Sequence, residues 1–210
     1  MGTRSILQII ELAREHEAQS GALREQLATD LPRLQTRLSL PEKAPLEALL
    51  NFVERYIDHV PDFLDSIDTQ AHDAGTRRLL HMAEDYFLAP PDALNGEEGL
   101  RALLDEAFLA HRFIEELNDR HCALRGKPLL EMDMTRANII AHFLIGEPMA
   151  TRLETLVSRS VDLAPLEAFR ADGPEACVVL PCMSRDAGVD LKLADGRDQS
   201  PLSEEGRDAG

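Results

Sequence analysis

The sequence of 210 residues contains no Trp, two Tyr and seven Phe, so aromatic side chains make up only 4% of the chain. Its apolar residues are mainly aliphatic, with Leu and Ala prominent, and both of these favour helix. Hydrophobic residues reach 44% and charged residues 29%, which is ordinary for a globular chain that is long enough to bury a core. The composition therefore predicts a folded helical domain and excludes a chain that is disordered throughout.

Cysteine is also scarce: Cys122, Cys177 and Cys182 are an odd number and cannot all pair within the chain. This count argues against a disulfide scaffold and is typical of a reducing compartment. Cys177 and Cys182 lie on either side of Pro181 with a spacing that does not match a zinc site. Because Glu11 interrupts the apolar start of the chain, no signal segment is indicated. We expect a cytoplasmic protein.

Basic residues are too few to balance the acidic ones: 22 Lys and Arg stand against 38 Asp and Glu, which gives a net charge of −16. The basic residues are scattered and form no patch, so binding to nucleic acid or to an acidic membrane surface is excluded. Long apolar runs are absent as well, and no stretch approaches the ~20 residues that span a bilayer. A basic protein partner, a small cationic molecule and a metal ion are compatible with this charge.

Apolar residues recur at helical spacing through most of the chain. The longest pattern, from Leu100 to His121, predicts a helix that Gly126 closes. A first helix is expected over 4–29, and Ser39 with Glu42 forms a candidate capping box for a second. Further helices are expected over 74–88, 133–145 and 148–160. The spacing predicts an all-α fold, a bundle of five or six main helices.

The pattern changes to a period of two after Gly173 and Pro174, where Val189, Leu191 and Leu193 alternate with polar residues. This predicts a small β-hairpin that packs on the bundle, because an isolated two-stranded ribbon is marginal in water. An exposed strand edge can accept a strand from a partner. The expected organisation is a helical bundle domain (1–172), a β-hairpin appendage (173–194) and a flexible acidic tail (195–210).

Four of the seven histidines lie on or beside the apolar stripes of separate predicted helices: His16, His59, His111 and His142. Glu115 lies one turn after His111 on the same helix face. Metal-binding bundles are assembled from such side chains, which different helices direct into one interior. These five residues are therefore a candidate site for iron, manganese or zinc.

Two familiar di-iron patterns do not match these histidines. Ferritin-like bundles need a Glu three residues before a His, but Phe108 precedes His111 and Ile139 precedes His142. Hemerythrin-type bundles need paired histidines one turn apart, which no predicted helix supplies. The leading interpretation is therefore that the histidines are hydrogen-bonded residues at the solvated edges of the bundle and that the protein has no cofactor, with the metal site as the alternative. A general-base role without metal is a third interpretation.

A polar line also follows the longest predicted helix: His111, Glu115, Asn118 and Cys122. Either this line faces water or arginines of a neighbour, or it forms a polar pocket or network inside the bundle. Asn138 and His142, one turn apart on the next helix, are its candidate counterpart.

No phosphate-binding loop and no nucleophile elbow is present, so whether the chain is an enzyme stays open. The leading hypothesis is a cytoplasmic protein that acts through protein–protein interaction or regulation, with a protein partner or self-association. The alternative is a non-haem metal-binding bundle, which could act as an oxidoreductase. A small-molecule pocket among Tyr56, Phe108, Ile114 and Phe143 is compatible with any bundle.

Overall fold

The computed structural model describes residues 2–70, 74–88, 98–128, 130–131, 133–163, 178–179 and 188–192. These residues form seven helices: α1 (Gly2–Ser20), α2 (Ala22–Leu34), α3 (Pro45–Gln70), α4 (Ala74–Leu88), α5 (Leu100–Arg125), α6 (Thr135–Ile145) and α7 (Met149–Leu163). The mostly helical fold confirms the expected class. Among the described helices, none combines the length and the apolar character that crossing a membrane requires.

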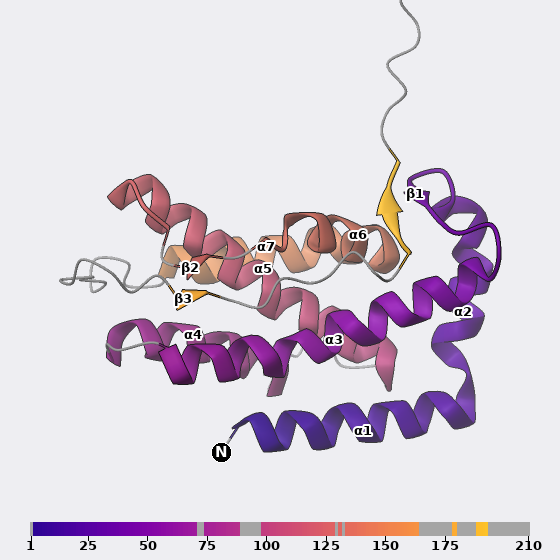
Figure 1. Cartoon of the computed structure of the whole chain (residues 1–210), viewed down its shortest axis with the longest axis horizontal. Coiled ribbons are helices and arrows are strands. Elements are labelled where there is room, and N and C mark those ends of the chain that lie inside the picture. Colours follow the sequence, from indigo (N-terminus) through magenta and orange to yellow (C-terminus); the bar gives the residue numbers. More distant parts are fainter. Residues whose placement is uncertain are drawn as a thin grey trace, which may run out of the picture.

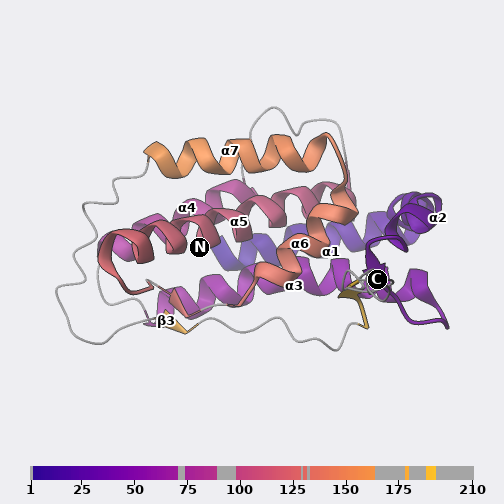
Figure 2. The same cartoon turned by 90° about the horizontal axis from the view of Figure 1, so that it is seen from above.

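Helix α5 lies at the centre of the bundle and contacts all six other helices. Figure 1 shows α1 on one side of the molecule and α6 and α7 toward the other, and Figure 2 shows α7 running alongside α5. Leu104 and Phe108 lie on one face of α5 and Phe113 on the opposite face, yet all three are fully buried, as expected for an interior helix. The helix ends at Gly126, as predicted, where φ is 73° and the N–H donates to the Cys122 carbonyl.

The first predicted helix is divided in two by Gly21, which has φ 63° in the left-handed region. The Glu17 carboxylate then accepts hydrogen bonds from the backbone N–H groups of Leu23 (2.9 Å) and Arg24 (3.0 Å), which satisfies donors in the first turn of α2. Pro32 lies inside α2 near its end. The division accounts for one helix beyond the six that the sequence predicts.

The predicted capping box is wrong. Ser39 belongs to strand β1 (Leu38–Ser39), and α3 begins later, at Pro45. Leu38 is buried, which holds this segment in an extended conformation against the core. Proline suits the first position of a helix because its missing N–H has no partner there in any case.

The strand pairing corrects the expected hairpin. Strand β4 (Asp190–Leu191) pairs antiparallel with β1, with Leu191 opposite Leu38. Strand β3 (Val178–Val179) pairs in parallel with β2 (Leu130–Glu131). The two small sheets lie at opposite ends of the bundle in Figure 1, so the described parts of the two segments do not pair with each other. Residues 180–187, inside the expected hairpin, and the expected tail at 195–210 lie outside the described residues.

Contacts to the bundle explain why β4 pairs with β1. The Arg136 guanidinium donates to both carboxylate oxygens of Asp190, at 2.7 and 2.8 Å, and the Lys192 N–H donates to the Arg37 carbonyl at 2.9 Å. Val189 is buried. Strand β4 therefore gains partners on a surface that the helices already hold in place.

Candidate functional site

The structure places the five predicted metal ligands in three separate locations. His59 and His111 meet in the core between α3 and α5. Glu115 and His142 line a cleft between α5, α6 and α7, whereas His16 lines a groove between α1, α4 and α5. No group of three or more His, Cys, Asp or Glu in the described part of the chain could hold a metal ion.

The two core histidines form a buried pair. His59 Nδ1 lies 3.0 Å from His111 Nε2, and the rings of Tyr56 and Phe63 lie 4.4 and 5.3 Å from the His111 ring. Burial, followed by the nearby His59, lowers the pKa of His111 well below its usual value, while the Ala107 carbonyl acts weakly in the opposite direction. His111 is therefore a neutral ring of the aromatic core, and the interpretation as a solvated edge residue is wrong for this pair.

We call the first surface site the α5–α6–α7 cleft. It has a volume of about 310 Å³ and is lined by Arg112, Glu115, Thr135, Asn138, Ile139, His142, Phe143 and Glu154. This volume falls at the lower end of the range for small-molecule pockets. Polar side chains from three helices meet apolar ones in this cleft, which is a common composition of ligand sites.

Glu115 forms a rigid wall of the cleft. Its side chain is buried and accepts hydrogen bonds from the Thr135 hydroxyl (2.6 Å), the Asn138 amide (2.7 Å) and the Arg112 guanidinium. The Asn138 side-chain oxygen accepts in turn from the Tyr56 hydroxyl at 2.7 Å. Burial and the Glu115 charge raise the pKa of Tyr56 well above its usual value, so the hydroxyl stays a donor. These bonds fix the orientation of Glu115 and join α5 to α6 and α3.

His142 and Glu154 form the more open wall of the cleft. His142 Nδ1 lies 3.1 Å from Glu154 Oε1, and His142 Nε2 lies 3.2 Å from Glu147 Oε1. The Thr151 hydroxyl donates to Glu147 at 2.7 Å and is the main cause of the lowered pKa of that carboxyl. Among the described residues nothing donates to the second carboxylate oxygen of Glu154. A ligand can therefore use this oxygen without displacing a bond.

The charges of the cleft favour a cation. Glu115 and Glu154 supply two carboxylates, and Arg112 supplies one guanidinium that is already engaged with Glu115. Ile139 and Phe143 supply an apolar surface, and Ile139 is 39% exposed although it is a large hydrophobic residue. The cleft therefore suits a small molecule with a positive group and a short apolar body.

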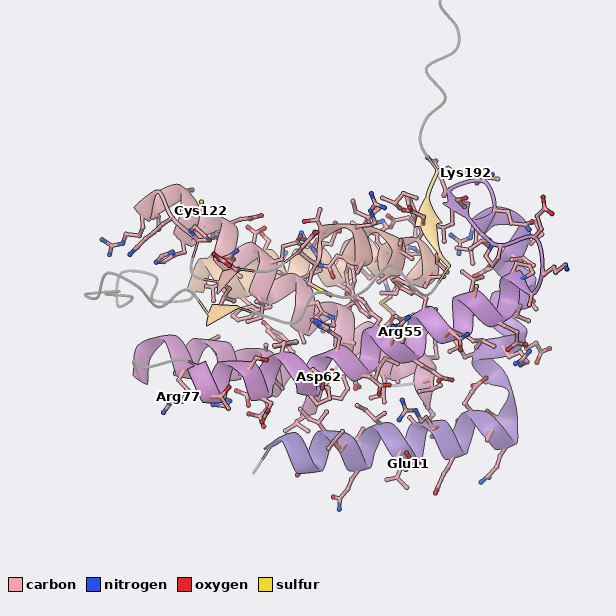
Figure 3. All side chains as sticks on the ribbon, viewed as in Figure 1. Glu11, Arg55, Asp62, Arg77, Cys122 and Lys192 are labelled. Atoms are coloured by element: carbon pink, nitrogen blue, oxygen red, sulfur yellow. The ribbon has the colours of Figure 1, made fainter. Side chains whose placement is uncertain are left out.

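We call the second surface site the α1–α4–α5 groove. It has a volume of about 370 Å³, and most of its lining is apolar: Ile9 and Leu12 from α1, Phe87 and Leu88 from α4, and Leu103 from α5. His16, Glu98 and Glu106 are its ionisable groups. The groove is lined by residues of α1, α4 and α5, whereas the cleft is lined by residues of α5, α6 and α7. Figure 1 shows α1 and α6 on different sides of α5. Charged side chains such as Glu11 of α1 and Arg77 of α4 cover the outside of the bundle (Figure 3).

The groove differs from the cleft in containing Glu106, a carboxylate with a raised pKa. Burial, followed by the nearby Asp105, raises the pKa of this carboxyl to about 7. No hydrogen bond or ion pair to Glu106 is found within the described part of the chain. His16 is engaged elsewhere, with its Nε2 3.7 Å from Glu98 Oε2. Within these ranges, Glu106 is therefore a half-buried carboxylate without a bonding partner.

Gly99 allows His16 to lie against the start of α5. A Cβ atom at Gly99 would lie 2.5 Å from His16 Nδ1, and the backbone there has φ 71°. The positive φ favours glycine at this position, and a Cβ here would also displace the His16 ring.

Of the two interpretations of the polar line on α5, the hydrogen bond between Glu115 and Asn138 supports the one in which the line forms a network inside the bundle. Farther along the same line, the Asn118 side-chain oxygen accepts from the Leu130 N–H at 2.9 Å, whereas Cys122 is exposed. Sequence reasoning missed Arg112, Thr135, Glu154 and Glu106. The signal for Glu106 is its position three residues after the buried Leu103, at the border of the apolar stripe.

No protein-family model matches the chain, and neither a curated protein nor a solved structure matches it. What the cleft and the groove can bind is therefore inferred from their own residues.

Proposed function

We propose that the chain is a cytoplasmic binding protein whose α5–α6–α7 cleft takes up a small organic cation, an amine or guanidinium compound with a short apolar body. The observation that carries this proposal is the second carboxylate oxygen of Glu154, to which nothing donates among the described residues. It lies in a cleft whose other wall, Glu115, is held in place by donors from two helices. A site that is fixed before binding loses less conformational entropy when the ligand enters.

The ligand's positive group is placed at Glu154, whose second carboxylate oxygen is open to the cleft. A charge-assisted hydrogen bond to this oxygen is stronger than one between neutral groups. The apolar body then covers Phe143 and Ile139, which removes exposed hydrophobic surface from water. The net charge of −16 attracts cations and repels anions of the same size.

Isothermal titration calorimetry tests this proposal with agmatine and putrescine as cationic probes and succinate as the anionic control. The expected result is saturable binding of at least one amine and none of succinate. Because Glu154→Gln removes a charged acceptor, it should weaken amine binding about tenfold or more. Glu25→Gln, on the exposed face of α2, is the matched control and should leave the affinity unchanged. Equal binding of succinate, or an unchanged affinity in Glu154→Gln, would contradict the proposal.

One specific observation supports the alternative function, metal binding. Two nitrogen ligands at about 2.0–2.1 Å from one metal ion lie about 3 Å apart when their bonds are near a right angle, as in octahedral coordination, and about 3.3 Å apart in a tetrahedral site. The distance of 3.0 Å between His59 Nδ1 and His111 Nε2 equals the first of these separations. Elemental mass spectrometry of untagged protein, with a 300–700 nm absorption spectrum, tests it. Stoichiometric iron, manganese or zinc that is lost in His59→Asn would support this alternative, and metal-free protein would contradict it.

A further inference from the structure

We infer that the α1–α4–α5 groove is a docking surface for a partner protein and that it receives an apolar segment carrying one Lys or Arg. This goes beyond the proposed cation binding, because it concerns another face of α5 and other residues.

The apolar lining provides the first part of the argument. Phe87 and Leu103 form a buried floor, with exposed fractions of 1% and 4%, while Leu12 at the rim is 65% exposed. A leucine that is exposed next to a hollow of about 370 Å³ leaves apolar surface in water that a partner's side chain can cover. Insertion of apolar anchors between helices is a recurring mode of peptide recognition.

The unpartnered carboxylate provides the second part. Glu106 lies in this mostly apolar lining, where a charge without a hydrogen-bond partner is costly. The ionisable groups around it are Asp105 on α5, Glu98 just before α5 and His16 on α1. The lining residues from α4 are apolar, so no basic side chain in the described lining neutralises Glu106. A Lys or Arg from the partner would supply the missing donor and the opposite charge.

The net charge favours a partner over a second copy of this chain. Two copies would each carry a net charge of −16, so their association is opposed by electrostatic repulsion. A basic segment of another protein is attracted by the same charge, which raises the association rate.

A library of random 12-residue peptides displayed on phage tests the inference without assuming any particular partner. Selection is carried out against the full-length protein, with counter-selection against the variant Leu12→Asp. Because the Leu12 side chain lies at the surface, this variant should keep its circular dichroism spectrum. The expected result is a set of groove-dependent peptides that share apolar residues and one Lys or Arg. Absence of groove-dependent peptides, or a set without basic residues, would overturn the inference.

A double-mutant cycle then assigns the basic residue to Glu106. Lys→Gln in a selected peptide should weaken binding to the natural protein about tenfold, but less than twofold to Glu106→Gln. Glu25→Gln is the control and should behave as the natural protein does. Binding of the Lys peptide should also strengthen from pH 6 to pH 8, because Glu106 then loses its proton, and this trend should vanish in Glu106→Gln.

An equal effect of the Lys→Gln change on both proteins would overturn the role of Glu106. Sedimentation velocity tests whether a second copy of the chain fills the groove instead of a partner protein. A dimer that Leu12→Asp dissociates would show this and would also overturn the inference. Loss of amine binding by Glu154→Gln is independent of these results, so the two proposals can fail separately.

Discussion

Glu115 and Glu106 are the same chemical group on the same helix, yet their surroundings differ completely. The helical repeat places them about 180° apart around α5. Glu115 faces α6 and accepts bonds from Arg112, Thr135 and Asn138. Glu106 faces α1 and α4 in an apolar lining and has no such partner among the described residues. The comparison shows that two carboxylates on one helix differ in their bonding because different elements pack against the two faces of that helix.

The largest change in stability is expected when the charge of Glu115 is removed. Glu115→Gln replaces an acceptor of three hydrogen bonds and leaves the Arg112 guanidinium, 25% exposed, without its counter-ion. We expect a loss of about 2–4 kcal/mol in the free energy of unfolding, since breaking a buried pair strands the other charge. Urea unfolding at pH 7.5, with Glu25→Gln as the exposed control, measures it. A loss no larger than that of the control would contradict the structural role of Glu115.

Removing the charge of Glu106 should have the opposite effect and increase the free energy of unfolding. The pKa of this carboxyl is about 7 in the folded protein, against 4.5 for the free side chain. The folded state therefore holds the proton more tightly, and this group costs stability as the pH rises from 4.5 through 7. Glu106→Gln should raise the free energy of unfolding at pH 8 by about 1 kcal/mol, after allowance for its partial exposure to solvent.

Urea unfolding of Glu106→Gln at pH 8 and pH 4 checks this prediction. The gain should be present at pH 8 and should disappear at pH 4, where the carboxyl is protonated in both states. A destabilised variant at pH 8 would show that Glu106 has a bonding partner in the folded protein.

The sequence predicted those features that depend on residues close together in the chain. The spacing from Leu100 to His121 indicated helix α5, and Gly126 indicated its end. The polar line through Glu115, with Asn138 as its counterpart, gave the network as one of two interpretations, and the bond between these two side chains agrees with that one. In these cases a helical repeat alone determines which side chains share a face.

Features that depend on distant partners could not be predicted in this way. Strand β4 pairs with β1, and the Asp190 carboxylate binds Arg136, although all three segments are far apart in the sequence. Alternation of apolar and polar residues identifies a strand but not its partner. For the same reason the histidines were grouped by their position on apolar stripes, whereas the packing of the helices separates His16 from His59 and His111.

The ionisation of Glu106 tests the difference between the two carboxylates most directly. A ¹³C NMR titration of protein labelled at the glutamate side-chain carboxyl carbons, with Glu106→Gln to assign the signal, follows it from pH 4 to pH 9. We expect the Glu106 signal to titrate with a midpoint of about 7, because the carboxyl is partly buried beside Asp105 without a partner among the described residues. A midpoint near the ordinary value of 4.5 would contradict the account, since Glu106 would then be solvated or paired in the folded protein.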